Sequence, residues 1–139
     1  MNTQQIADFF RERDRLAVHL GIELLEVSEG RSVARMKITD CHLNGVDVGH
    51  GGAIFTLADL AFAACSNSHG TVAVAVNISI SYLRPAREGD LLTATAEEVS
   101  MSPKISTCLI TVTNQAGDKV ALFQGMAYRK KDPLESVIA

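Results

Sequence analysis

One acidic residue lies in the middle of the most apolar run of the chain. The run covers residues 53–66, AIFTLADLAFAACS, and the acid is Asp59. An ionised carboxylate that is buried without partners costs several kcal/mol. Two interpretations follow from the residues alone. Asp59 is either a structural acid that pairs with a hydroxyl or a backbone N–H, or a carboxylate that faces a cleft as a base or nucleophile.

The segment His50-Gly51-Gly52 stands where a polar loop enters this apolar run. The first N–H groups of a helix lack internal partners and lie at its positive end, and glycine lets a ligand approach the backbone closely. A carbonyl oxygen that gains negative charge would be stabilised there, as in an oxyanion hole. Taken alone, the glycines are also compatible with a plain tight turn, and His50 with a residue that packs at the start of a helix.

The spacing of Gly51 and Asp59 constrains how they could act together. They are eight residues apart on one expected helix, which places them about 12 Å apart along its axis. Both groups therefore cannot reach the same carbonyl carbon from one chain. Two antiparallel helices across a two-fold axis could bring Gly51 of one chain to Asp59 of another. Read as catalysis, the spacing predicts an obligate homodimer with two shared sites.

The elements around this run indicate an α+β fold. Amphipathic spacing predicts an N-terminal helix over residues 3–20, and the Ala- and Leu-rich residues 53–66 predict a helix that is buried on every face. Strands are expected at residues 22–27 and 32–38, followed by four β-rich runs after Gly70. Together they predict an antiparallel sheet of about six strands that wraps around one long central helix, in a single domain over residues 1–139.

Composition excludes several classes of partner. The chain of 139 residues has a net charge of −3 and a pI of about 5.8, so it lacks the basic face of a nucleic-acid binder. The positive residues 129–131 are expected to form a solvated tail rather than a ligand site. Cys41, Cys65 and Cys108 match no zinc spacing and suit a reduced, cytoplasmic setting. No signal-peptide pattern is visible, and residues 53–65 are too short to span a membrane.

Three stretches together resemble a known family. They are LNGVDVGHGGAIFTLADLAFA, NISISYLRPAREGDLLTATAEEV and TVTNQAGDKVALFQGMAYR. These stretches resemble the hot-dog thioesterases of the phenylacetate-degradation (PaaI) type, over residues 20–129. The resemblance implies a hot-dog dimer, often paired into a homotetramer, that hydrolyses acyl-CoA thioesters with no metal or redox cofactor. The acyl group in this family often contains a ring.

The resemblance also implies roles for individual residues. Asp59 matches the catalytic Asp, Gly51 the oxyanion-hole glycine, and His50 the His beside that glycine. Asn44 matches an Asn that positions the thioester or the attacking water. Some animal relatives carry a hydroxyl residue where this chain has Ala73, which leaves the placement of the water open.

Three further residues are candidates for CoA binding. Asn77 either hydrogen-bonds a neighbouring loop or lines the channel for the pantetheine arm. Arg84 either forms a surface ion pair with an acid such as Glu88 or contacts a CoA phosphate. Lys104 has the same two interpretations, and it lies in the segment Ser102-Pro103-Lys104, where the family often has Gly followed by a basic residue.

The sequence therefore predicts an acyl-CoA thioesterase in which Asp59 acts as general base or as nucleophile. Two alternatives are a hydratase or dehydratase and a non-catalytic acyl-CoA binding protein. The first usually needs a different Asp/His or Glu/His arrangement, which the sequence lacks. The second has no need for a carboxylate in the wall of an apolar acyl site.

Overall fold

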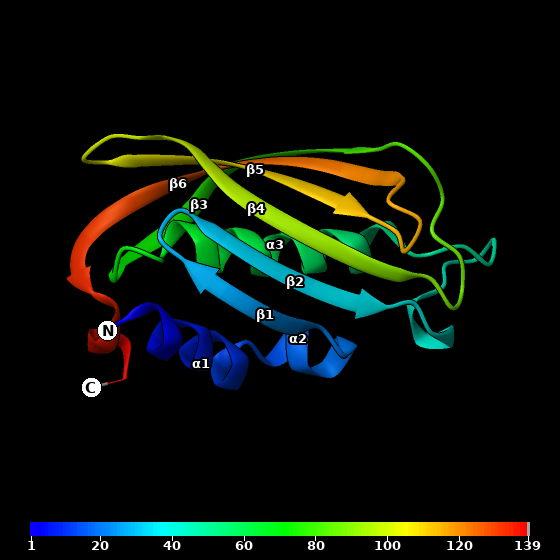
Figure 1. The fold of residues 1–139 in the computed structure, drawn as a ribbon, viewed down its shortest axis with the longest axis horizontal. Coiled ribbons are helices and arrows are strands. Elements are labelled where there is room, and N and C mark those ends of the chain that lie inside the picture. The colour runs from blue at the N-terminus through cyan, green and yellow to red at the C-terminus, as the bar shows by residue number, and fades with distance from the viewer. Residues whose placement is uncertain (139) are drawn as a thin grey trace.

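The computed structural model describes residues 1–138. Along the chain its elements are α1 (Thr3–Arg13), α2 (Arg15–Leu20), β1 (Glu23–Ser28), β2 (Arg31–Lys37), the short 3-10 helix η1 (Asp40–His42), α3 (Gly51–Ser66), β3 (Thr71–Tyr82), β4 (Leu91–Met101), β5 (Ile105–Thr113), β6 (Lys119–Pro133) and the 3-10 helix η2 (Leu134–Val137). The predicted order of a helical N-terminus, two strands, one long helix and four strands is confirmed (Figure 1).

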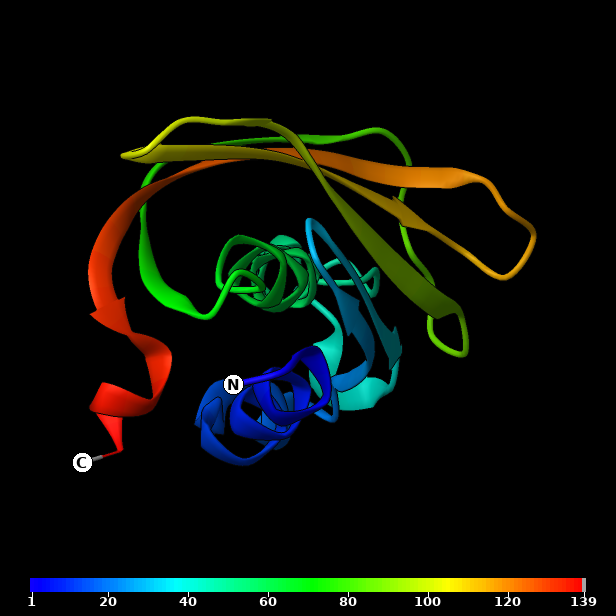
Figure 2. The same cartoon turned by 60° about the vertical axis from the view of Figure 1, so that its left-hand side comes forward.

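All six strands form one antiparallel sheet in the order β1-β2-β4-β5-β6-β3. The sheet curves around α3, which lies in its concave face, while α1 and α2 lie beyond β1 and β2 on the open side (Figures 1 and 2). This is the hot-dog fold that the resemblance implied. The strand order leaves β3 at one edge of the sheet and β1 at the other.

A glycine in β6 lets the sheet approach α3 closely. The ring of Phe62 packs directly on Gly125, where an added Cβ atom would lie only 2.7 Å from the ring. Phe62 also contacts Phe123, with ring centroids 5.7 Å apart, and both rings are almost completely buried. The middle of α3 is therefore held against the centre of the sheet.

One prediction about α3 is wrong within the single chain. Its sequence predicted burial on every face, but one stripe stays partly or fully exposed. The stripe consists of Gly52, Phe55, Thr56, Asp59 and Ala63. These positions recur at intervals of three and four residues, so they share one side of the helix. The sheet, together with contacts from α1 and α2, covers the remaining sides, and Asp59 belongs to the side that stays open.

The ends of β1 and β2 are shifted by one residue from the predicted ones, and three larger differences occur elsewhere. The N-terminal helix breaks at Asp14, whose side chain accepts a hydrogen bond from Ala17 N (3.1 Å) and caps α2. The central helix begins at Gly51, two residues earlier than expected, so both glycines lie in its first turn. Residues 129–131 belong to β6, which continues to Pro133, so the predicted tail is part of a strand, although Lys130 and Lys131 are exposed to solvent as expected.

Candidate active site

The first turn of α3 offers one unpaired backbone donor. His50 caps the helix, because its Nδ1 accepts a hydrogen bond from Gly52 N at 2.8 Å. The backbone N–H groups of Ala53 and Ile54 donate to His50 O. Within residues 1–138 the N–H of Gly51 has no hydrogen-bond acceptor. It remains available at the positive end of the helix, where a developing negative charge is stabilised.

Gly51 lines a surface cavity of about 410 Å³ that Asn44, Tyr82 and Arg84 also line. The predicted residues Asn44, Gly51 and Arg84 are therefore brought together. The cavity lies where the loop before α3 meets the end of β3. It is large enough for part of a ligand, and its polar groups converge from three segments that are distant in sequence.

The loop itself orients the side chain of Asn44. Asn44 Oδ1 accepts hydrogen bonds from Val46 N at 2.9 Å and from Val48 N at 3.3 Å. No acceptor for Asn44 Nδ2 occurs in residues 1–138. The amide oxygen is thus occupied by the loop, and the NH₂ group is the part that can bind a ligand. A carbonyl oxygen in the cavity could accept from it.

Tyr82 is a neighbour of the site that the sequence reasoning missed. Its hydroxyl donates to Gly51 O at 2.8 Å, which ties the end of β3 to the start of α3. Burial raises the pKa of Tyr82, so the hydroxyl stays protonated as a donor at neutral pH. An added Cβ at Gly51 would lie 3.1 Å from the tyrosine ring. The sequence signal was only an aromatic residue in the segment YLRP, which does not indicate its partner.

Asp59 lies eight residues further along α3 and does not line the cavity of Gly51. Its pKa is raised, first by burial and then by the negative charge of Asp14. No hydroxyl or backbone N–H within residues 1–138 donates to its carboxylate, so the structural pairing considered for this residue is not found. Asp59 is therefore a partly desolvated acid without a hydrogen-bond partner, on the open stripe of α3.

The structure separates the three candidates for CoA binding. Arg84 lines the cavity of Gly51, and its Nη1 forms an ion pair with Asp118 Oδ2 at 3.0 Å rather than with Glu88. Both partners of this pair are about half exposed, so the pair is weak.

Asn77 and Lys104 lie elsewhere in the chain. Asn77 is exposed on the edge strand β3, and its side chain makes no hydrogen bond to a loop within residues 1–138. Lys104 lies in a different cavity, at the turn between β4 and β5. One chain therefore does not gather all the predicted site residues in one place.

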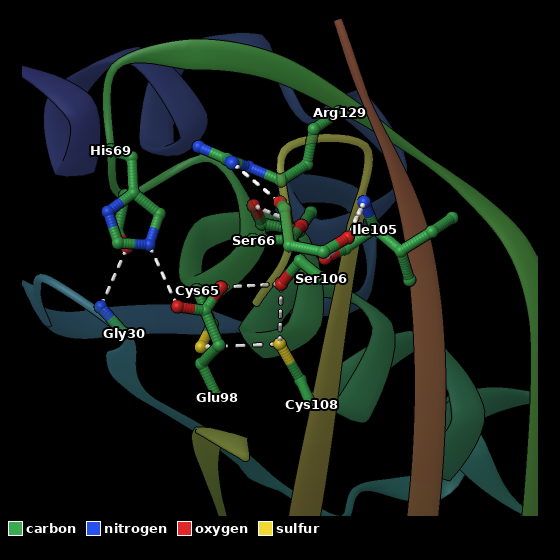
Figure 3. Close-up of polar contacts among 12 residues, drawn as sticks. Gly30, Cys65, Ser66, His69, Glu98, Ile105, Ser106, Cys108 and Arg129 are labelled. Atoms are coloured by element: carbon green, nitrogen blue, oxygen red, sulfur yellow. Dashed lines mark hydrogen bonds and ion pairs between the residues drawn. The ribbon is translucent and has the colours of Figure 1, made fainter. Parts of the chain in front are cut away.

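A second polar cluster lies near the C-terminal end of α3 (Figure 3). Glu98 Oε2 accepts a hydrogen bond from Ser106 Oγ at 2.5 Å, and Glu98 Oε1 lies 2.9 Å from His69 Nε2. Beside it, the thiol sulfurs of Cys65 and Cys108 are 3.6 Å apart. The contact with Cys108 and burial raise the pKa of the Cys65 thiol. Buried thiols of this kind serve packing, and none of the predicted site residues lies in this cluster.

Within residues 1–138 no group of three or more His, Cys, Asp or Glu side chains is arranged to hold a metal ion. The same part of the chain has no helix with the length and apolar character needed to cross a membrane.

Comparisons with known proteins give the family. Residues 48–121 match the model of the thioesterase superfamily. The acyl-coenzyme A thioesterase PaaI of Escherichia coli is 42% identical over 90% of this chain and 89% of its own length. The chain therefore belongs to the thioesterase superfamily.

Two solved structures are similar to the described fold. The structure of the E. coli PaaI protein from the phenylacetic acid degradation operon has a TM-score of 0.90 and 40% identity, covering 94% of each chain. A hypothetical thioesterase with coenzyme A from Streptococcus pneumoniae has a TM-score of 0.77 and 27% identity, covering 81% of this chain and 90% of its own. Within the superfamily, this chain is similar to PaaI over nearly its whole length.

Proposed function

We propose that the protein is an acyl-CoA thioesterase that hydrolyses its substrate to a free acid and CoA. The observation that carries the proposal is the pair of unpaired donors, Gly51 N–H and Asn44 Nδ2, on one cavity at the positive end of α3. Membership of the thioesterase superfamily supports the same reaction.

The two donors suit the oxygen of a thioester carbonyl. When a nucleophile attacks the carbonyl carbon, negative charge develops on this oxygen, and Gly51 N–H and Asn44 Nδ2 would donate to it. Removing one such donor typically costs about 10²–10³ in rate. His50 acts indirectly, because its ring accepts from Gly52 N and keeps the first turn of α3 in place beside Gly51.

Asp59 of a second copy of the chain would complete the reaction. As a general base, it takes a proton from a water molecule whose oxygen attacks the carbonyl carbon. The C–S bond then breaks, and the CoA thiolate takes up the proton held by Asp59 as it leaves, which restores the carboxylate. As a nucleophile, Asp59 instead attacks the carbonyl carbon itself, the C–S bond breaks as the CoA thiolate leaves, and water then hydrolyses the resulting mixed anhydride to the free acid and the Asp59 carboxylate. Its raised pKa suits either role, since it strengthens the carboxylate as a base.

Two exposed features of the chain support this homodimer. The stripe of α3 that contains Asp59 is not covered by the sheet, and β3 is an edge strand with exposed apolar residues, Val74 at 43% and Val76 at 57%. Unpaired edge strands readily pair with another chain. Antiparallel pairing of two β3 strands across a two-fold axis would lay the two open stripes against each other. We further propose that two such dimers form a homotetramer in the cytoplasm.

The acyl group that we propose is aromatic, of the phenylacetyl type. The support is the similarity to a PaaI protein whose gene lies in a phenylacetic acid degradation operon. We expect a higher kcat/KM for phenylacetyl-CoA than for palmitoyl-CoA. A preference for palmitoyl-CoA would contradict the aromatic substrate but would leave the reaction class intact.

Release of free thiol from phenylacetyl-CoA and medium-chain acyl-CoAs, followed with a thiol reagent, tests the reaction. Asp59→Asn should abolish the release without loss of fold, while Glu97→Gln, which changes an exposed acid on β4, should not. A hydratase would change an enoyl-CoA without releasing thiol, and a binding protein would bind CoA esters without turnover. Near-normal turnover by a folded Asp59→Asn protein would refute the role of this carboxylate.

A further inference from the structure

A cavity at the junction of α1 and α2 is lined by none of the predicted site residues. Its volume is about 330 Å³, and its wall consists of Phe9, Phe10, Arg13, Asp14 and Arg15. The chain has only five Phe and two Tyr residues, so this one wall holds two of its seven aromatic side chains. Apolar cavities of about 150 Å³ are known to bind benzene. The volume is therefore sufficient for an aromatic ring.

The ring of Phe9 is not used by the hydrophobic core. Its neighbour Phe10 packs against the core, whereas Phe9 is partly buried only by side chains of α1 itself. The two rings meet edge to face, with centroids 5.1 Å apart and an interplanar angle of 81°. Aromatic rings prefer this arrangement, and a third ring can join the pair in the same way. Phe9 thus offers an aromatic surface to a ligand.

The cations in the wall select against positive charge in a ligand. Arg13 lies over the ring of Phe9, with its Cζ atom 5.3 Å from the ring centroid. Within residues 1–138 neither Arg13 nor Arg15 forms an ion pair, although Asp14 lies between them in the chain. A guanidinium is attracted to the face of an aromatic ring. The wall therefore suits an aromatic ring that carries no positive charge.

The break between the two helices fixes the polar edge of the cavity. The backbone N–H of Asp14 donates to Phe10 O at 3.1 Å at the end of α1. The side chain of Asp14 accepts from Ala17 N, also at 3.1 Å, at the start of α2. Ala17 is buried in the core. The position of the Asp14 carboxylate is therefore set before any ligand binds.

Asp14 also relates the cavity to the proposed catalytic carboxylate. Its negative charge is the second cause of the raised pKa of Asp59, and charges more than about 10 Å apart are largely screened. Both α1 and α2 contact α3. Figure 2 shows these two helices, in blue, beneath α3 and away from the curved part of the sheet. The cavity therefore lies near the stripe of α3 that carries Asp59.

We propose that this cavity receives the aromatic ring of the acyl group, an assignment that rests on the proposed thioesterase function. In either of its roles, Asp59 must lie at the carbonyl carbon of the thioester. CoA extends from this carbon on one side, so the acyl group extends from it on the other.

In the proposed dimer, one copy supplies both Asp59 and the ring cavity. A thioester whose carbonyl oxygen is bound at Gly51 of the first copy has Asp59 of the second copy at its carbonyl carbon. An acyl group that passes this Asp59 meets the α1–α2 junction of the same second copy. Phe9 and Arg13 are then specificity-determining residues that touch the acyl ring and take no part in the chemical step.

The test compares phenylacetyl-CoA with butanoyl-CoA, whose acyl group has no ring. Phe9→Leu keeps an apolar side chain on α1 but removes its aromatic ring. We expect kcat/KM for phenylacetyl-CoA to fall about three- to tenfold relative to kcat/KM for butanoyl-CoA. The control Val18→Ala shortens an apolar side chain of α2 that is 61% exposed and does not line the cavity. It should leave the ratio of the two values unchanged.

Equal losses for both esters, or no loss for either, would overturn the ring site while leaving the reaction class intact. If Phe9→Leu does not fold, Arg13→Gln removes the cation over the ring instead, and the same ratio decides.

A binding arm keeps this result separate from the proposed function. The affinity for free phenylacetate is measured by calorimetry for the wild-type protein and for the Phe9→Leu and Val18→Ala variants. If the wild-type protein hydrolyses neither ester but only Phe9→Leu weakens phenylacetate binding, the ring site is supported and the thioesterase function is not. Equal affinities of all three proteins would overturn the ring site.

Discussion

Mixing two inactive variants tests whether the active site is shared between chains. Gly51 and Asp59 are separated by about 12 Å along α3, whereas reacting groups must lie within about 3–3.5 Å of the atoms they act on. A single chain cannot meet this requirement. One variant is Asp59→Asn, which removes the carboxylate. The other is Asn44→Asp, which keeps an oxygen for Val46 N and Val48 N but removes the NH₂ donor.

The expected magnitude follows from counting sites. If the two variants are unfolded and refolded together in equal amounts, half of the dimers contain one copy of each. In such a dimer one site carries both lesions and the other carries neither. The mixture should therefore recover about a quarter of the wild-type activity, as two-fold symmetry with shared sites requires. Each variant refolded alone is the control and should stay inactive.

Thiol release from an acyl-CoA measures the recovered activity, and differently tagged copies show by pull-down that mixed dimers form. If each chain held a complete site, every site in the mixture would keep one lesion. A mixture that contains mixed dimers and stays inactive would refute the shared site, and Gly51 would then be a turn glycine.

Three further outcomes are expected. Burial raises the pKa of Asp59, and only its ionised form reacts. The acid-side fall of kcat/KM should therefore have its midpoint at a pH above 3.8, the ordinary pKa of aspartate. A midpoint at or below pH 3.8 would contradict this. Because its pKa is raised, the folded state binds the Asp59 proton more tightly than the unfolded state does. The contribution of this proton to the free energy of unfolding is fully present below pH 3.8 and is lost as pH rises through the raised pKa. Asp59→Asn should therefore be more stable than the wild type in denaturant titrations at pH 7, with a difference that shrinks toward pH 3.8, whereas a constant difference would argue against this linkage. Gly125→Ala should lose about 1–3 kcal/mol of unfolding free energy by overpacking against Phe62. The control Gly45→Ala, where an added Cβ meets nothing within 4 Å, should not lose stability. Equal stabilities of the two variants would show that Phe62 can move aside.

The sequence predicted the parts of the fold that depend on local pattern. Alternating runs gave all six strands, and a carboxylate in an apolar run was visible without any structure. The break at Asp14 was missed because the apolar spacing continues through it, while the capping bond to Ala17 N depends on local backbone geometry. The open stripe of α3 was missed because a helix that is apolar all round gives no sign of which side the sheet leaves uncovered.

Contacts between distant segments could not be predicted from the sequence. The partner of Arg84 is Asp118 rather than the nearby Glu88, because the chain folds Asp118 back beside the end of β3. Lys104 and Arg129 meet only through the pairing of β5 with β6. Likewise, the hydroxyl of Tyr82 reaches Gly51 because β3 ends where α3 begins. Such partners depend on strand register, which no single segment encodes.

The contact between Phe62 and Gly125 has a consequence for the direction of Asp59. A helix without large side chains could rotate about its own axis in the concave face of a sheet. The ring of Phe62 prevents this rotation, because it packs on the backbone of Gly125, which has no side chain. Since each residue turns an α-helix by about 100°, Asp59 projects about 60° around the axis from Phe62. The azimuth of the carboxylate is thus set by a glycine on β6, so a substitution there would misdirect Asp59 even in molecules that remain folded.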